Sequence, residues 1–368
     1  VALANLLLGV YNQYTEADIA PYGSMRYNQI ELYAQDHWQV LPNLTLDYGL
    51  RYQYMPAMIE RGDRIATFDP ARYDPASAPQ MTSSGNLVAG TGVAYNGIAV
   101  AGQNGVPRGL YENDNNNVAP RVGFTWDPWK NGKSAIRGGF GVFFDRPVTN
   151  STRDQAASPP FVQSVVISNG RLDNPGAGAA STAPPGGFEA LATDFQAPVV
   201  YQWSVGYQRA LPWQMALDMN FVSNEARNLL RVRELNFATP GATGVAPTPI
   251  NNNRPYRGYG RITINETTSQ SDYRGLQVSL NRRSDGNIGW GLAYTLSRAR
   301  GDADSEDSTS SSSLPQDPRN PAGEWGLQDF SRRHVLAVNY MWNVPFYKDG
   351  RGLTGGLFGG WQITGITK

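Results

Sequence analysis

Apolar and polar side chains alternate strictly over residues 28–54. The even positions are almost all apolar on both sides of a break at Pro42 and Asn43, and most odd positions are polar. A period of two on both sides of a tight turn predicts an antiparallel β-hairpin with one apolar and one polar face. Each arm exceeds the usual ~5–6 residues of a soluble strand and suits the ~9–11 residues of a tilted membrane-spanning strand.

Four further pairs of alternating segments follow the same design, each with a turn in its middle. They occupy 121–145, 201–221, 276–296 and 336–366. The pattern therefore predicts about ten strands in five hairpins, the last strand, near 357–366, being the weakest. The apolar run 1–10 fits either a short helix or the end of a strand.

Between the hairpins the periodicity disappears. Four such segments, rich in Gly, Pro, Asn, Asp and Ser, are predicted as long loops: 55–118, 146–198, 224–272 and 298–332. Outer-membrane barrels place short turns on the periplasmic side and long loops outside, whereas a soluble sandwich has no reason to sort its loops in this way. The predicted fold class is therefore all-β, an antiparallel transmembrane β-barrel.

Tryptophans gather near the predicted tight turns. Indole prefers the boundary between membrane and water, so tryptophans crowded at one end of the strands indicate an aromatic girdle. The alternative is that they are core aromatics of a soluble β protein. The girdle candidates are Trp38, Trp126, Trp129, Trp213, Trp290 and Trp342.

The polar phase of the strands carries mixed charges and many amides. In a barrel these side chains line the lumen, where they suit contact with a plug or a hydrated solute rather than strong ion selectivity. The lumen-facing candidates are Glu31, Gln35, Asp47, Arg51, Arg121, Arg137, Gln202, Gln208 and Gln277.

Composition narrows the classes of protein that remain possible. Lys plus Arg (31) equals Asp plus Glu (31), so charge gives no argument for a nucleic-acid partner. The chain has no cysteine, which excludes a disulfide framework and a thiol nucleophile. No apolar run approaches the ~18 residues of a transmembrane helix. The chain begins at Val1 without an export signal, so we expect either a processed protein or a piece of a longer one.

Nothing in the sequence indicates an enzyme, a cofactor or a metal site. His37 and His334 are the two histidines, and neither has a second ligand nearby in sequence. The acidic stretch 302–307 resembles a calcium loop in composition but lacks its spacing. The Asn-rich loop patches 113–117 and 251–259 fit either a sugar or peptide site or ordinary loop structure.

Several phrases together resemble the barrel region of TonB-dependent outer-membrane receptors, and most closely their Oar-like group. The resemblance covers nearly the whole chain in the family's order and is specific only as a set. The phrases are LYAQDHWQVLPNLTLDYGLRYQY, NNVAPRVGFTWDP, GKSAIRGGFGVFFDRP, YQWSVGYQRAL, YRGLQVSLNRR and PQDPRNPAGEWGLQDFSRRHVL.

This resemblance implies a 22-stranded barrel, of which ten strands are fewer than half. It also implies a plug and a TonB box, neither of which is visible here, so the chain is expected to be an internal piece. The expected function is uptake of a siderophore, glycan or peptide, caught by the long loops and driven through the TonB complex. Outer-membrane lipid is the other expected partner. The alternatives are a structural or adhesion protein anchored by its barrel, and a soluble β-sandwich or propeller-like binding module.

Asp36 is the one exception to the apolar phase of the first hairpin. A carboxylate facing the ~25 Å lipid band is unfavourable. We therefore expect either a bulge or register shift that turns Asp36 away, or a position closer to the periplasmic rim.

Overall fold

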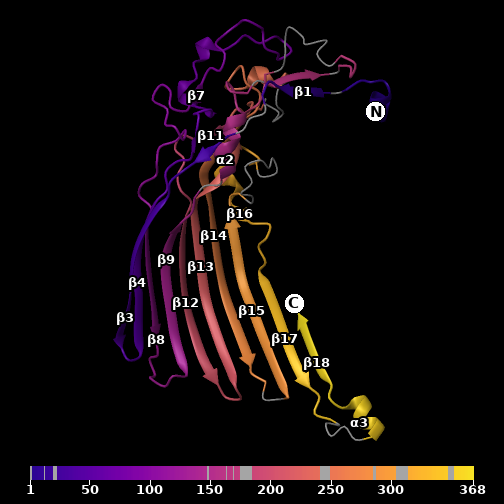
Figure 1. The fold of residues 1–368 in the computed structure, drawn as a ribbon. Helices are drawn as coiled ribbons and strands as arrows, with labels where there is room; N and C mark the ends of the chain where they lie inside the picture. Colours follow the sequence, from indigo (N-terminus) through magenta and orange to yellow (C-terminus); the bar gives the residue numbers. More distant parts are fainter. Residues whose placement is uncertain are drawn as a thin grey trace.

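One large antiparallel sheet dominates the computed structural model of the chain (Figure 1). Five hairpins lie side by side, and the sheet ends in β3 on one side and β18 on the other. The structure describes residues 2–11, 13–19, 23–146, 149–162, 164–168, 170–174, 185–240, 249–284, 287–303, 314–346 and 352–368. The ten strands are β3 (Ile30–Leu41), β4 (Leu44–Tyr54), β8 (Val118–Trp126), β9 (Ser134–Phe144), β12 (Val199–Leu211), β13 (Met215–Glu234), β14 (Ile262–Arg282), β15 (Ile288–Gly301), β17 (His334–Asn343) and β18 (Gln362–Thr367).

Four short turns lie at one end of this sheet, and the connections between the five hairpins lie at the other (Figure 1). The connection between β17 and β18, which contains α3 (Gly352–Phe358), is longer and lies at the short-turn end. Two short strands extend the sheet at the long-loop end: β11 (Phe188–Leu191) pairs parallel with β14, and β16 (Gly326–Leu327) pairs antiparallel with β15. The predicted order of five hairpins is confirmed. Among the described residues, no helix has the length and apolarity needed to cross a membrane.

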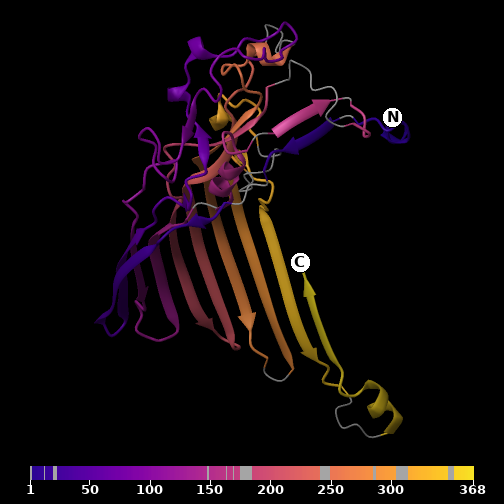
Figure 2. The same ribbon diagram turned by 45° about the horizontal axis from the view of Figure 1, so that its top comes forward.

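Smaller elements occupy the long connections. Figure 2 shows the β1–β10 pair standing apart from the large sheet near the N-terminus. These elements are α1 (Ala2–Leu7), β1 (Gln13–Ala17), β2 (Met25–Arg26), β5 (Ile59–Glu60), β6 (Ala66–Phe68), β7 (Ile98–Val100), α2 (Thr149–Arg153), β10 (Ser164–Ser168) and α3 (Gly352–Phe358), with short 3-10 turns at Pro70–Arg72, Pro75–Ser77, Asp154–Ala157, Ile250–Asn253 and Pro321–Glu324.

Cross-strand pairing carries the alternation of the sequence across the whole sheet. Directly paired residues lie on the same face, so each row of partners belongs to one face of the sheet. An apolar row runs through Trp38, Leu46, Phe124, Gly138, Val205, Phe221, Leu276 and Leu296. A polar row runs through Gln35, Gly49, Arg121, Gly141, Gln202, Asn224 and Tyr273.

The apolar face of the sheet is open rather than covered. Leu32, Trp38 and Val122 keep 65%, 53% and 52% of their surface exposed. A soluble sandwich buries this face against a second sheet. The soluble-module alternative is therefore wrong, and the face has the character of a lipid-contacting surface.

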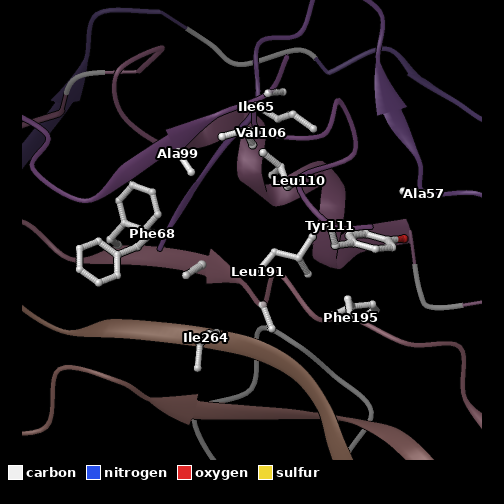
Figure 3. Packing of buried hydrophobic residues seen from close by; sticks show 14 of the residues in the cluster. Ala57, Ile65, Phe68, Ala99, Val106, Leu110, Tyr111, Leu191, Phe195 and Ile264 are labelled. Carbon is white, nitrogen blue, oxygen red and sulfur yellow. The ribbon is translucent and has the colours of Figure 1, made fainter. Parts of the chain in front are cut away.

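The buried core lies in the loops instead. Segments 55–117, 149–162, 185–198, 227–240 and 249–270, which we call the loop layer, pack together around one apolar cluster (Figure 3). Phe68, Leu110, Leu191 and Ile262 are fully or almost fully buried there. The ring of Phe68 contacts those of Tyr256 and Tyr259 edge to face, with centroids 4.8 and 5.3 Å apart. The long loops are therefore a packed unit with its own apolar interior.

The predicted loop boundaries need correction. Much of 224–272 is strand, because β13 runs to Glu234 and β14 begins at Ile262. The alternation is interrupted there by register shifts between Ala226 and Arg231, and both faces become buried, which removes the polar phase that sequence analysis relies on. Segments 55–118, 146–198 and 298–332 likewise contain short elements, and β15 extends to Gly301. At the C-terminal hairpin, α3 occupies part of the range predicted as the last strand.

Asp36 does not occupy a bulge. It pairs with Tyr48 in regular register, and the register shift lies between Gln39 and Leu41, on the turn side. Its carboxylate instead accepts hydrogen bonds from the Tyr48 hydroxyl (2.9 Å) and the backbone N–H of His37 (2.8 Å). The expected bulge at Asp36 is wrong because a hydrogen-bond donor on the same face satisfies the carboxylate without a change of register.

Candidate functional site

The nine polar-phase residues predicted from the sequence share one face of the sheet. Their directly paired partners place them in a few neighbouring rows, from Gln35 on β3 to Gln277 on β14. The rows pass through glycines as well as charges, for example Gly206 between Arg137 and Asn220. The structure thus gathers side chains from six strands onto one polar surface.

Charges on β3 and β4 pair with each other on this surface. Arg51 lies 3.2 Å from Glu31, which also accepts a hydrogen bond from the side chain of Gln53 (3.2 Å). His37 Nδ1 and Asp47 Oδ1 are 2.6 Å apart. These side chains are well exposed, so each pair contributes little to stability. Their arrangement presents both signs of charge to whatever passes over the face.

Two hollows open on the polar face. The first, of about 770 Å³, lies on β3, β4 and β8 and is lined by Gln35, Asp47, Arg51 and Arg121, together with His37. The second, of about 1030 Å³, lies on the strands from β12 to β18. It is lined by Asn281, Asn339 and Thr364 together with large apolar side chains such as Leu211, Trp290 and Met341. The first hollow is therefore the one that polar and charged side chains dominate.

The six predicted tryptophans all lie at the short-turn end of the sheet. Trp38, Trp126, Trp290 and Trp342 are in rows of the apolar face. Trp129 and Trp213 stand in the turns themselves, where Trp213 keeps 76% of its surface exposed. This placement matches the geometry of a girdle, and contact with headgroups remains a prediction. Trp203 lies farther toward the long-loop end of the same apolar face.

Polar residues bind the loop layer together from within. The Asn236 amide donates to the carbonyl oxygens of Tyr256, Tyr259 and Gly260 at 3.0, 3.1 and 2.7 Å, and it accepts from the backbone N–H of Tyr256. Asn236 is fully buried, and its side chain links the segment after β13 to residues 256–260 ahead of β14. No periodic pattern in the sequence marks this residue.

Several ion pairs join β13 to its surroundings, and three of them are 2.7 Å or shorter. Arg233 contacts Glu266 through two hydrogen bonds of 2.9 and 2.7 Å. Arg254 Nη1 and Glu234 Oε1 are 2.6 Å apart, and Arg231 is paired with Asp302 at the same distance. The bidentate contact of Arg233 with Glu266 fixes geometry as well as charge.

The asparagine-rich loop patches serve mainly as structural links. Asn113 accepts a hydrogen bond from the N–H of Ala57, and Asn117 donates to the carbonyl oxygen of Gln53. Asn251 and Asn252 donate to the carbonyl oxygens of Gly85 and Thr82. These contacts account for the amides as loop structure, so they supply no argument for a sugar site.

A third hollow, of about 510 Å³, lies within the loop layer between segments 87–96, 186–188 and 258–259. Its lining includes Tyr95, Phe188 and Tyr259 and no charged residue. Burial raises the pKa of Tyr259 well above its usual value, and its hydroxyl donates to the carbonyl oxygen of Asn96 (2.8 Å). The chemistry of this hollow suits an uncharged group.

The acidic stretch predicted at 302–307 is only partly described. Asp302 is engaged by Arg231, and residues 304–313 lie outside the described part of the chain. Within the described residues no three His, Cys, Asp or Glu side chains converge as a metal site.

Several solved structures are similar to the chain at low identity. The outer membrane transporter YddB from Escherichia coli matches 85% of the chain and 39% of its own, with 11% identity and a TM-score of 0.43. The siderophore receptor PirA from Acinetobacter baumannii matches 92% of the chain and 38% of its own, with 10% identity and a TM-score of 0.41. The FrpB iron transporter from Neisseria meningitidis matches 86% and 30%, with 10% identity and a TM-score of 0.41.

The chain therefore spans between 30% and 39% of the length of these three proteins. No curated protein matches it. A family model described as the outer membrane beta barrel domain matches residues 1–368, and the chain belongs to this family.

Proposed function

We propose that the chain is a segment of the barrel of a TonB-dependent outer-membrane transporter of the Oar-like group. The observation that carries the proposal is the separation of two faces over ten strands whose edges, β3 and β18, are both left without a partner strand among the described residues. Such a sheet needs further strands to remove its edges in lipid. A 22-stranded barrel of the transporter type supplies them.

In this proposal the apolar face meets lipid and the polar face lines the lumen. The nine polar-phase residues, with the hollow beside Arg51 and Arg121, contact the plug or the passing solute. The loop layer closes the outer end and holds the solute before uptake. Energy comes from the TonB complex, acting through regions of the protein outside this chain. A siderophore, a glycan and a peptide are all compatible solutes.

A second candidate is a surface structural or adhesion protein that uses the barrel as an anchor. The observation favouring it is the loop layer, whose apolar interior and Asn236 contacts make a folded unit at one end of the sheet. Such a unit can present a fixed surface to a partner. Transport requires energy from the TonB complex and anchoring does not, so an experiment can separate the two functions.

The experiment deletes the full-length gene in its native host and follows depletion of medium components by mass spectrometry. Transport predicts that at least one solute is no longer depleted, and that complementation restores its uptake only when tonB is intact. A deletion strain with unchanged depletion but lost surface attachment supports the anchor instead. Complementation with Arg51→Ala and Arg121→Ala together tests the polar face directly. The control is Lys133→Gln, an exposed substitution in the short turn between β8 and β9.

A further inference from the structure

On the apolar face, arginines follow the last apolar residues of the strands toward the long-loop end. On β15 the outward positions are Ile288, Trp290, Leu292, Tyr294 and Leu296, followed by Arg298 and Arg300. The neighbouring β14 changes in the same way, from Leu276 to Arg274. The change from apolar to cationic thus occurs at the same level on two adjacent strands.

The length of the apolar stretch fits a lipid bilayer. From Ile288 to Leu296 the chain advances eight residues along β15. A tilted strand rises roughly 2.4 Å per residue along the membrane normal, which gives about 19 Å between Cα atoms before side chains are added. The apolar band of an outer-membrane barrel is about 25 Å tall. Arg298 therefore lies at the level of the lipid headgroups.

Arg274 and Arg298 are direct cross-strand partners. Like charges in this position repel each other, because their Cβ atoms are only ~5 Å apart. Arg274 is partly compensated by Asp272 (3.1 Å) and Glu225 (3.7 Å). Arg298 makes no hydrogen bond or ion pair with any residue that the structure describes. Arg298 is therefore the cation of the pair that no carboxylate of the described residues contacts.

A third cation adjoins the pair. Arg332 lies two residues before β17, and its carbonyl oxygen accepts a hydrogen bond from the Ser297 hydroxyl, 2.9 Å away on β15. Its guanidinium donates only to backbone carbonyl oxygens, those of Asp329 and Ser331. Below it on the same face, His334 is paired with Leu296, and its ring lies against that of Tyr294. Arg274 on β14, Arg298 on β15 and Arg332 just before β17 thus lie at one level along the sheet, beyond the leucine and aromatic side chains of this face.

We propose that Arg274, Arg298 and Arg332 bind the phosphate of a membrane lipid headgroup in the leaflet at the long-loop end. Guanidinium groups match phosphate oxygens in bidentate geometry. The apolar side chains of Leu276, Tyr294 and Leu296 receive the acyl chains of the same molecule. A lipid is the expected source of the phosphate because the cations adjoin the apolar face and not the polar one. The site depends on the proposed function in one respect, namely which leaflet of the membrane it contacts.

The test uses the full-length protein, purified from outer membranes in mild detergent, and counts retained phospholipid and phosphorylated glycolipid by native mass spectrometry. The variants are Arg298→Gln alone, Arg274→Gln with Arg298→Gln, and Arg298→Lys. Arg257→Gln, which removes one charge from an exposed loop position, is the control. Heat-modifiable migration on gels establishes that each variant is folded.

We expect the double variant to retain at least threefold less phosphate-bearing lipid than the wild type and Arg298→Gln alone to retain an intermediate amount. Arg298→Lys, which keeps the charge without the planar guanidinium, should lose less lipid than Arg298→Gln, and Arg257→Gln should stay near the wild-type level. Dihexanoyl phosphatidic acid should raise the thermal midpoint of the wild type, and inorganic phosphate at the same concentration should not. Equal lipid retention by the folded double variant overturns the site. Equal stabilisation by inorganic phosphate overturns the assignment to lipid and leaves a free-anion site. Neither measurement requires solute uptake, so failure of the transport proposal is registered separately.

Discussion

At the scale of single residues, Asp36 illustrates how a polar group is accommodated on the apolar face. Its carboxylate depends on the Tyr48 hydroxyl and on one backbone N–H. Replacing Tyr48 by Phe removes the side-chain donor and leaves the Asp36 carboxylate without this hydrogen bond. The loss destabilises the folded protein most where water is excluded. We expect Tyr48→Phe to lower the thermal midpoint of the full-length protein more in lipid vesicles than in detergent micelles.

The matched variant for this prediction is Asp36→Val combined with Tyr48→Phe. With both polar groups removed, only the backbone N–H of His37 loses a partner. The double variant should therefore recover most of the loss caused by Tyr48→Phe alone. If the double variant is no more stable than the single one, the hydroxyl and the carboxylate are not coupled on the lipid-facing surface.

Two glutamates in the loop layer are expected to change the stability of the protein with pH in opposite directions. Burial, together with the nearby Asp154 carboxylate, raises the pKa of Glu189 above its usual value, although the Asn265 amide works against the shift. For Glu60 burial is outweighed by N–H donors from Arg64, Gly62 and Ser24, which hold the pKa below its usual value. The stabilisation from Glu189 is present below the unfolded pKa of about 4.3 and is lost as pH rises through its higher folded pKa. That from Glu60 is present above the unfolded pKa and lost as pH falls.

Glu189→Gln should therefore make the loop layer more stable than wild type at pH 7, with the difference vanishing near pH 4. The carboxamide keeps an oxygen that can accept from Asn265, so the shape of the site is retained. Glu60→Gln should destabilise at pH 7 and lose its effect in acid. The measurement is the difference in thermal midpoint between each variant and the wild type at successive pH values. A Glu189→Gln difference that grows toward acid pH contradicts the assigned direction.

At the scale of elements, the buried pair of Arg231 and Asp302 joins the extended part of β13 to the end of β15. Their side chains are 3% and 4% exposed, and Asp302 Oδ1 also accepts hydrogen bonds from the Ser269 hydroxyl (2.7 Å) and the N–H of Gln270 (2.9 Å). Removing one partner of a buried pair costs ~3–5 kcal/mol because the other charge is left without compensation.

We expect Asp302→Asn to open the long-loop end of β13, β14 and β15 while the short-turn end stays folded. Hydrogen exchange of the full-length protein should show faster exchange at 227–234 and 262–270 and unchanged exchange at 215–222. The control is Asp317→Asn, which breaks an exposed pair with Arg319 and should leave all these segments unchanged. Acceleration along the entire strands would mean that the pair supports the sheet rather than its extension.

The same elements show what sequence patterns reveal and what they miss. The hairpins were predictable because one face of each strand contacts water and the other contacts an apolar phase. Polar and apolar residues therefore alternate along the strand with a period of two. The extensions of β13 and β14 were missed because Leu230 and Arg231 are both buried and a register shift lies beside them. The Asn236 contacts were missed because one asparagine in a loop has no pattern, and its partners are backbone carbonyls that any sequence supplies.

At the scale of the whole molecule, the two edges of the sheet decide what the chain can do alone. Within the part of the chain that the structure describes, β3 and β18 each have one neighbouring strand, whereas β13 lies between β12 and β14. In lipid an unpaired strand edge leaves backbone N–H and C=O groups without partners, at a cost of several kcal/mol for each group. The edges must therefore be paired by strands elsewhere in the full-length protein, or the sheet is unstable in a membrane.

Hydrogen exchange of residues 1–368, refolded in detergent micelles, tests this requirement against the full-length protein. In the isolated chain we expect amides of β3 and β18 to exchange much faster than those of β13. In the full-length protein all three strands should be protected alike, because both edges then lie inside a closed sheet. Equal protection of β3 and β13 in the isolated chain would mean that its edges are already satisfied. Cross-linking at low protein concentration would then distinguish closure of one chain on itself from pairing between two copies.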